Sequence, residues 1–583
     1  MYRYFIISEL TVFFFVAFSI LGKKTRVLAV EPLFPYSRLL LQKLVLFFIR
    51  VGLSEWSIDD YPNLARIKED PVRSLLYDVF GETELWQDKT FKFSEADNAI
   101  GEYSMPFKHI VSNYCFHEKH VTLLLMREIH STIGFSNVKF LGLPEDTLSA
   151  IGEYCSNSKP PKRTFIPVRG INLVYSILMV LVCLIWTITH CRLRRKKAKD
   201  FFLAADFIND DRDKMLYEEL DDGGPILMVR RGNKTYFRPP NELRKYSFCF
   251  KESGIIFFAD IYSVIKSKIS DTILLYLFAG KMHPLVFWRI VMLPYKRLLW
   301  RGLFQCYKPR FFWARDSYNE DHIIRRQELN RVGGKLYSVN TGTISWAILS
   351  PPWRYISFDR YYVFGKGVYK EYYGNTWSTD MEVIPSGTFT AERRHYLDRF
   401  ENRPGDIAIF LSVYTSEPEV HEFVVGVAKA FPRKRVYLQI KKGFRSHFGA
   451  QNIINKCSNI PNIVYTEERV YDLFEKATFG ISDPSSVVNE SLQLGMKAFT
   501  LDIPSVHKTN PFRKHPEMII TSATEFIERI ELIENKSWVY PTASFQDLVD
   551  MSGIVFADRV RKDMGLIPKD RNPKPLISNF NTL

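Results

Sequence analysis

Residues 481–503 constrain the fold more than any other stretch, because they read as strand, polar turn, helix, glycine and strand. The turn, Asp483 to Ser486, predicts a helix start with a capping side chain and a proline that needs no N–H in the first turn. Gly495 then ends the helix and allows the chain to turn into an apolar strand at 498–503. Such a unit is typical of a parallel sheet, and the N–H groups at its helix start suit a bound phosphate.

The same alternation of strands and helices extends well upstream of this unit. We predict a second series with strands at 406–413, 435–440, 463–465 and 478–481 and helices at 418–430, 451–456 and 470–476. A first series has expected strands at 200–207, 225–229, 254–258, 335–339 and 361–363 and ends near 383–387. Alternating elements of this kind build doubly wound parallel sheets, which bind ligands at the carboxyl ends of their strands. The sequence therefore predicts an α/β protein with two Rossmann-like halves and an active site in the cleft between them.

The segment 481–503 resembles the donor-site segment of glycosyltransferases with the GT-B fold. Two further stretches, 315–335 and 361–387, carry the resemblance, which covers roughly residues 200–545. It points to bacterial surface-carbohydrate and capsule biosynthesis transferases, and more loosely to CDP-glycerol glycerophosphotransferases and polysialyltransferases. The resemblance implies that Ser485 and Ser486 contact phosphate and that Glu490 binds the ribose. Many retaining members have a second glutamate that would fall at Ser482, so retention of configuration is not implied.

Three basic side chains follow the predicted strand 435–440, where related proteins often have a Lys-Pro-His-Pro-like element. Here Lys441, Lys442 and Arg445 stand in a Lys-Lys-Gly-Phe-Arg sequence, so the lysine is kept and the His-Pro is lost. These cations are expected to neutralise the phosphates of a nucleotide donor. The alternative is a solvated basic turn.

Glycosyl transfer to an alcohol by inversion requires a base for the acceptor hydroxyl. Asp316 is the preferred candidate, since it lies in a polar turn before a predicted helix at 321–327, and His322 is the second. The alternatives are that Asp316 only caps the helix and that His322 only packs. The sequence shows no metal-ligand spacing and no GxGxxG or Walker-type loop, so we expect metal-independent transfer with a nucleotide-sugar co-substrate and no other cofactor.

Charge and hydropathy point to a membrane rather than to nucleic acid. The 583 residues carry a net charge of +15, and basic residues lie beside apolar and aromatic runs without a nucleic-acid-binding motif. The seven scattered cysteines indicate reduced thiols in a cytoplasmic setting. Residues 171–190 are apolar with basic flanks on both sides; we favour a span over a segment at the cytoplasmic surface. Residues 4–30 read as strand, helix and strand in preference to a signal peptide.

Residues 285–313 mix aromatic and basic side chains in the way that suits lipid headgroups. We predict membrane binding here in preference to a core helix with a solvated basic face. The side chains expected to contact lipid are Trp288, Arg289, Lys296, Arg297, Trp300 and Arg301.

The predicted domain organisation has five parts. These are an N-terminal α/β region at 1–170, a membrane segment at 171–199, an acceptor-side domain at 200–395, a nucleotide-donor domain at 396–545 and a C-terminal tail at 546–583. We favour an N-terminal region that completes the acceptor domain; the alternative is that it stands outside the membrane if both apolar segments span. The expected protein is a membrane-associated glycosyltransferase at the cytoplasmic face of a bacterial inner membrane. It would transfer a sugar from a nucleotide-sugar to a lipid-linked or growing polysaccharide acceptor. The alternatives are a CDP-alcohol phosphotransferase and a non-catalytic scaffold with the same fold.

Overall fold

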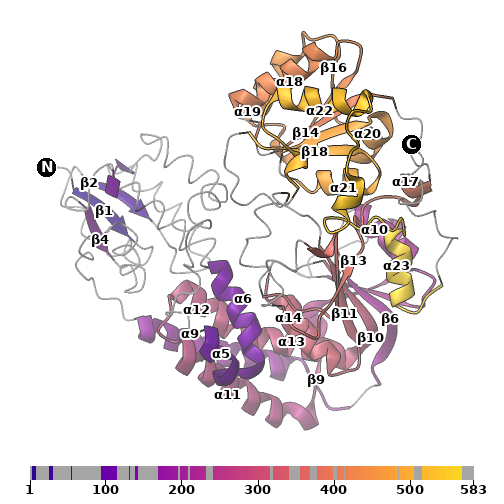
Figure 1. The fold of residues 1–583 in the computed structure, drawn as a ribbon. Helices are drawn as coiled ribbons and strands as arrows, with labels where there is room; N and C mark the ends of the chain where they lie inside the picture. The colour runs from indigo at the N-terminus through magenta and orange to yellow at the C-terminus, as the bar shows by residue number, and fades with distance from the viewer. Residues whose placement is uncertain are drawn as a thin grey trace.

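The structure, a computed structural model, describes most of the chain after residue 168 and selected segments before it (Figure 1). The described residues are 93–114, 126, 130–131 and 168–567, with gaps at 195–196, 208–210, 231–240, 316–318, 341–354, 368–376, 398–403, 413, 416, 484, 504–511 and 513–514, together with four short strands between residues 3 and 141.

The first sheet has four parallel strands in the order β3-β2-β1-β4. Their bounds are Arg3–Ile7 for β1, Thr25–Ala29 for β2, Ser54–Glu55 for β3 and Val138–Leu141 for β4. The parallel pair of β1 and β2 confirms the two strands predicted within 4–30, while the helix expected between them lies outside the described residues. This sheet is separate from the larger sheets, so the part of 1–170 that it represents does not extend the acceptor-side sheet.

The second sheet has seven parallel strands in the order β13-β12-β11-β10-β6-β7-β8. Their bounds are Lys199–Asp206 (β6), Ile226–Arg230 (β7), Ser247–Phe250 (β8), Tyr307–Ala314 (β10), Lys335–Val339 (β11), Arg360–Val363 (β12) and Glu382–Pro385 (β13). The strands predicted at 200–207, 225–229, 335–339 and 361–363 are confirmed. The strand predicted at 254–258 forms only as the short β9 (Ile256–Phe257), which pairs with β5 (Cys191–Arg192) outside this sheet.

The third sheet has six parallel strands in the order β16-β15-β14-β17-β18-β19, and it confirms the whole predicted second series. The strands are β14 (Ile407–Leu411), β15 (Val436–Ile440), β16 (Ile463–Thr466), β17 (Phe479–Ser482), β18 (Lys497–Leu501) and β19 (Ile519–Ile520). The helices are α18 (Pro418–Ala430), α19 (Phe448–Cys457), α20 (Val470–Lys476), α21 (Val487–Gln493) and α22 (Ala523–Glu534).

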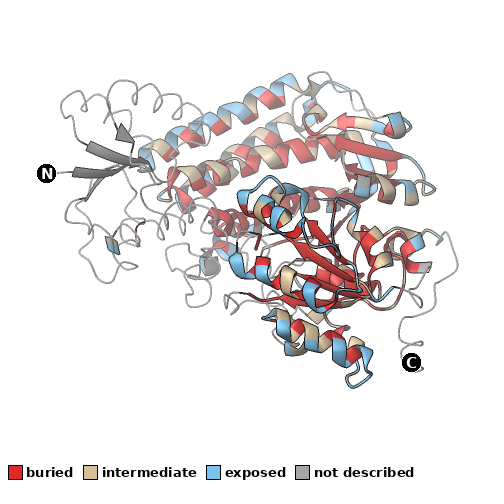
Figure 2. Cartoon of the chain, turned by 90° about the horizontal axis from the view of Figure 1, so that it is seen from above, coloured by how far each residue is buried: buried red, intermediate tan, exposed pale blue. Residues whose placement is uncertain are grey.

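Both large sheets begin near their centre and are wound in both directions, as in Rossmann-like domains. The strands are coloured as buried in Figure 2, and the outer helices alternate buried and exposed residues. The predicted α/β class with two Rossmann-like, GT-B-like halves is therefore confirmed.

The chain crosses back to the second sheet after α22. Helix α23 (Phe556–Asp563) lies beside that sheet in Figure 1, and its Phe556 ring packs edge-on against Trp313 and Tyr362. The Tyr362 hydroxyl donates a hydrogen bond to Asp563 at 2.8 Å. Residues 546–567 of the predicted tail are thus folded and return from the third sheet to the second.

The strand β10 corrects the prediction for 285–313. Its Phe312 and Trp313 are fully buried in the middle of the second sheet. A parallel strand covered on both faces takes a run of large apolar residues, and the sequence pattern did not distinguish this run from a lipid-binding one. Upstream of β10 the stretch forms α12 (Pro284–Val291) and α13 (Leu293–Cys306).

The six side chains predicted to bind lipid do not form an exposed basic surface. Trp300 and Arg297 are buried, and the Trp288 ring packs 5.0 Å from that of Tyr175. The four cations Arg289, Lys296, Arg297 and Arg301 instead pair with acidic residues of the same half, namely Glu320, Glu102 and Glu328. The alternative left open by the sequence, core helices, describes this stretch.

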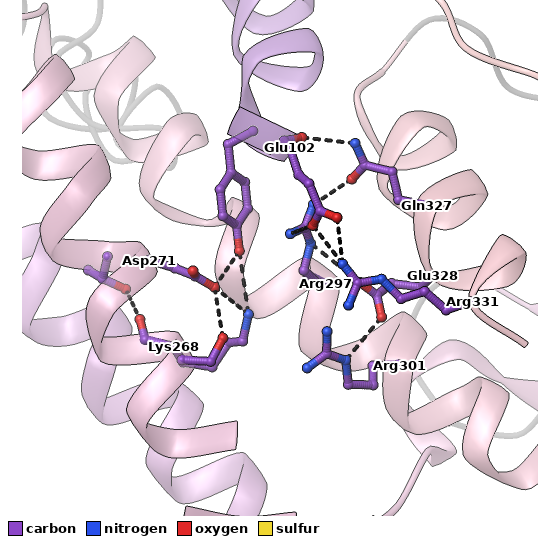
Figure 3. Close-up of polar contacts among 11 residues, drawn as sticks. Glu102, Lys268, Asp271, Arg297, Arg301, Gln327, Glu328 and Arg331 are labelled. Carbon is purple, nitrogen blue, oxygen red and sulfur yellow. Dashed lines mark hydrogen bonds and ion pairs between the residues drawn. The ribbon is translucent and has the colours of Figure 1, made fainter. Parts of the chain in front are cut away.

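Helices α5 (Phe93–Ala99) and α6 (Ser104–Tyr114) dock the N-terminal region onto this half. Between them, the Glu102 carboxylate pairs with Arg297 at 2.6 Å and with Arg331 at 2.7 Å, as Figure 3 shows. The Tyr103 hydroxyl donates to Asp271 at 2.6 Å, and Asp271 also pairs with Lys268. The acceptor-side half therefore includes residues from the predicted N-terminal region.

Candidate functional site

One cavity of about 520 Å³ lies at the carboxyl ends of β14, β15 and β17, where the sheet order reverses. This is the position at which doubly wound sheets bind ligands. All six predicted donor-site residues line it: Lys441, Lys442, Arg445, Ser485, Ser486 and Glu490. The other half contributes Arg212 from α10 (Asp211–Glu219), and the connection between the halves contributes Thr388, Phe389 and Thr390.

The basic side chains that line this cavity differ in the ion pairs and hydrogen bonds they form with the protein. Lys441 and Lys442 are exposed, and neither forms an ion pair within the described part of the chain. Arg445 is fixed by two hydrogen bonds, from Nε to the Ile440 carbonyl at 2.9 Å and from Nη1 to Glu467 at 2.7 Å. The two lysines are thus available to an incoming anion, whereas Arg445 shapes the rim.

Glu490 lies opposite these cations with both carboxylate oxygens in hydrogen bonds. The Tyr471 hydroxyl donates to Oε2 at 2.7 Å, and the Ser486 hydroxyl donates to Oε1 at 3.1 Å. Burial raises the pKa of the Glu490 carboxyl, although these two hydrogen bonds and the charges of Arg212 and Lys441 oppose the rise. A carboxylate held in this way can accept hydrogen bonds from sugar hydroxyls in a fixed orientation.

Tyr471 connects Glu490 to the segment between the two halves. Its buried hydroxyl is 3.0 Å from the Thr388 hydroxyl and also contacts that of Thr390. The Thr388 N–H in turn donates to Gln493 Oε1 at 2.6 Å. Tyr471 was not predicted from the sequence, because nothing in its local pattern distinguishes it from an ordinary core residue of α20.

The phosphate turn differs from the prediction in one respect. Asp483 does not cap the helix: its fully buried carboxylate accepts hydrogen bonds from Ser412 N at 2.6 Å, Ser412 Oγ at 2.9 Å and Tyr414 N at 3.1 Å. Helix α21 begins at Val487 without a side-chain cap, since the Asp483 carboxylate binds the loop that contains Ser412 and Tyr414. Gly495 ends the helix at a φ of 81°, as predicted.

Ser482 has a position that the sequence could not assign. It is buried, it lines the cavity, and its hydroxyl has no hydrogen-bond partner among the described residues. A buried hydroxyl without a partner is costly, which makes Ser482 Oγ a further polar group for a ligand to satisfy.

The two predicted catalytic residues fare differently. His322 is not brought to the cavity: it is fully buried, its ring stacks 4.7 Å from that of Phe358, and its Nδ1 donates to the Asn319 carbonyl. Burial holds its pKa well below the ordinary value, and it does not line the cavity. Asp316 lies outside the described residues and stays a prediction. Its neighbour Arg315 lies 4.6 Å from the Phe389 ring, which lines the cavity.

Other candidate groups are occupied or absent where the structure describes the chain. Asp221 pairs with Lys245 and Asp222 pairs with Arg561, and neither carboxylate lines the cavity. Within the described segments, no group of three or more His, Cys, Asp or Glu side chains could hold a metal ion.

Comparison with known proteins identifies no family. No protein-family model matches the chain, and no curated protein sequence matches it. Solved structures do match, at low similarity. UDP-GlcNAc 2-epimerase from Neisseria meningitidis, bound to UDP-GlcNAc, is 10% identical with a TM-score of 0.37, over 63% of this chain and 99% of that chain.

Two further structures match at a comparable level. The wall teichoic acid polymerase TagF is 10% identical with a TM-score of 0.36, covering 69% of this chain and 99% of that chain. The O-GlcNAc transferase of Thermobaculum terrenum is 10% identical with a TM-score of 0.30, covering 85% and 97%. None of these similarities is close enough to assign an activity to this chain.

Proposed function

We propose that this chain is a glycosyltransferase that takes a sugar from a nucleotide-sugar donor bound in the cavity at the carboxyl ends of β14, β15 and β17. The observation that supports it most is the arrangement in one cavity of Lys441 and Lys442 with the hydrogen-bonded Glu490. Two lysines without ion pairs suit a diphosphate, and a fixed carboxylate suits the ribose hydroxyls. Arg212 brings a cation from the other half, so a bound donor would contact both halves.

In the proposed reaction an acceptor hydroxyl oxygen attacks the anomeric carbon of the donor sugar. The bond from that carbon to the diphosphate oxygen breaks, and the nucleoside diphosphate leaves with the electron pair. Lys441, Lys442 and Ser482 would stabilise the leaving group, since preformed charges and dipoles are most effective where charge develops. The acceptor proton would pass to a base, for which Asp316 remains the candidate.

The proposed acceptor is a lipid-linked or growing surface glycan, and the proposed location is the cytoplasmic face of a bacterial membrane. The net charge of +15 supports contact with an anionic surface.

The proposal is tested first by nucleotide binding. Isothermal titration with UDP, GDP, CDP and CMP should find at least one ligand, and the Lys441→Ala/Lys442→Ala double variant should bind it at least about tenfold more weakly. The matched control is Lys429→Ala/Lys456→Ala, which removes two exposed lysines elsewhere on the same half. Equal affinity in both double variants would place the nucleotide elsewhere.

Donor profiling then separates the candidate activities. Release of nucleoside diphosphate from a nucleotide-sugar in the presence of acceptor supports glycosyl transfer. Turnover of CDP-glycerol alone would instead assign a CDP-alcohol phosphotransferase with the same cleft. Protein that binds no nucleotide at saturating concentration would be a non-catalytic scaffold.

A further inference from the structure

We infer that helices α9 (Val168–Thr189) and α11 (Ile261–Ala279) form a lipid-docking face that lies on an anionic bilayer without crossing it. This inference deepens the proposed function by naming the surface that meets the membrane, and its test involves no nucleotide. By length and hydropathy, α9 is the one helix among the described residues that could cross a membrane. The question is therefore what its apolar surface contacts.

The two helices form an antiparallel pair at one end of the molecule (Figure 1). The Asn172 side chain, near the start of α9, donates hydrogen bonds to the Gly280 and Met282 carbonyls at 3.0 and 2.9 Å, just past the end of α11. At the opposite end, β5 follows α9 and pairs with β9, which precedes α11. Both helices are thus held at both ends.

The inner face of α9 is built for contact with protein. Asn172, Ser176 and Thr187 are buried there, and the two hydroxyls donate to carbonyls one turn back at 2.9 and 2.7 Å. Beneath the pair, Lys268 of α11 is buried with Asp271 and the Tyr103 hydroxyl (Figure 3). Because α11 packs along α9, a bilayer crossed by α9 in this arrangement would also take in Lys268 and Asp271 of α11, and each ionised group in hydrocarbon costs several kcal/mol or more.

The outer faces of the same two helices are exposed and mostly apolar. The most exposed large side chains are Ile185 at 62% and Ile188 at 66% on α9, and Tyr262 at 77% and Leu277 at 75% on α11. Others on this face are Leu173, Val174, Ile177, Leu178, Leu181, Val182, Ile273 and Leu274. On α11 the exposed residues also include Ser263, Lys266 and Ser270. So many exposed large apolar side chains on two adjacent helices are still unusual in a monomeric soluble protein and mark an interaction site.

The charges around this face identify the occupant as anionic lipid. Arg169 and Lys281 are exposed at one end of the helix pair, and Arg192 and Arg194 are exposed at the other. An apolar face with cations at its margins is the arrangement of interfacial helices, in which apolar side chains enter the acyl boundary and cations meet headgroups.

The position of this face fits the proposed function. In Figure 1, α11 lies at the end of the molecule opposite α18 and α22 of the donor half. The donor cavity, at the carboxyl ends of the third sheet, is therefore held away from the bilayer, where a soluble nucleotide can reach it.

The test is flotation of the full-length protein with vesicles of phosphatidylcholine alone or mixed with phosphatidylglycerol. The wild-type protein should float with the anionic vesicles, and added salt should weaken binding. The triple variant Ile185→Gln/Ile188→Gln/Leu277→Gln should lower the partition coefficient at least about tenfold, because it removes apolar surface that lipid would cover.

The matched control removes three even more exposed apolar side chains from elsewhere: Phe448→Gln/Val539→Gln/Ile567→Gln, originally 81%, 83% and 82% exposed. It should float like the wild type. Equal loss in both triple variants, or no flotation of the wild type, would overturn the inference. So would retention of the wild type in membranes after alkaline carbonate extraction, which indicates a span, or self-association that only the α9 and α11 variant abolishes.

Discussion

Replacing Tyr471 with phenylalanine removes one hydroxyl from the centre of the proposed donor site and leaves the ring in place. That hydroxyl donates to Glu490 at 2.7 Å and contacts Thr388 at 3.0 Å. A hydrogen bond to a charged group contributes about 1.5–3 kcal/mol. The lost contacts to Thr388 and Thr390 add little, because these two hydroxyls already lie 2.8 Å apart and can bond to each other.

We therefore expect Tyr471→Phe to lower the free energy of unfolding by about 2 kcal/mol. For a half of this size that corresponds to a fall of roughly 4–8 °C in Tm, measured by scanning calorimetry. Tyr465→Phe is the matched control, since its hydroxyl makes only an exposed contact of 3.3 Å with Glu467. Its Tm should change by about 1 °C or less.

The variant should also weaken nucleotide binding, because Glu490 would lose the partner that orients it. If Tyr471→Phe and Tyr465→Phe melt at the same temperature and bind nucleotide alike, the network from Thr388 to Glu490 does not organise the site. In that case the proposed role of Glu490 loses its main structural support.

Three further perturbations follow from the same contacts. Because burial raises the Glu490 pKa, the ionised carboxylate destabilises the folded protein above that pKa, and this penalty disappears below the pKa of the unfolded chain. Without ligand, Glu490→Gln should therefore have a Tm no lower than that of the wild type at neutral pH, and the difference should vanish in acid. Its affinity for nucleotide should not change with pH, whereas that of the wild type should weaken on acidification. Gly387→Ala should displace the connection between the halves from Gln493, since a Cβ at its φ of 66° would meet the Gln493 side chain at 1.8 Å. Limited proteolysis should then cut this connection faster than in the wild type. Arg325→Met should lower stability in urea by about 3–5 kcal/mol, because it leaves the buried Asp206 carboxylate without its 2.5 Å partner.

The donor half could be predicted from sequence because its signals are local. Each strand from 406 to 501 is a short apolar run, and each helix begins or ends at a recognisable residue such as Pro418 or Gly495. The residues that line the cavity follow directly after strand ends, and parallel strands bring their carboxyl ends together at one edge. The cluster of Lys441, Lys442 and Glu490 is a consequence of that rule.

The acceptor-side half was harder to predict because its determinants are non-local. Phe312 and Trp313 lie in a buried strand. The basic residues Arg297 and Arg301 upstream of it are also largely enclosed, because they pair with Glu102 and Glu328 from other helices and turns. No local pattern shows that a basic side chain has a partner from a distant helix.

For a related reason the sequence did not show which face of helix α9 packs on protein. Hydropathy counts apolar residues but does not show which of them face protein, so Asn172 and the helices packed beneath it carried no signal. The same limitation applies to Asp483, whose role as a clamp on the Ser412 loop depends on a strand far upstream.

The most direct test of the account is a crystal or cryo-EM structure of the protein soaked with the nucleoside diphosphate that binds most tightly. We predict density in the cavity at the carboxyl ends of β14, β15 and β17, with the diphosphate beside Lys441 and Lys442 and the ribose hydroxyls on Glu490. Nucleotide bound elsewhere, or a cavity still empty at a saturating concentration, would contradict the central claim.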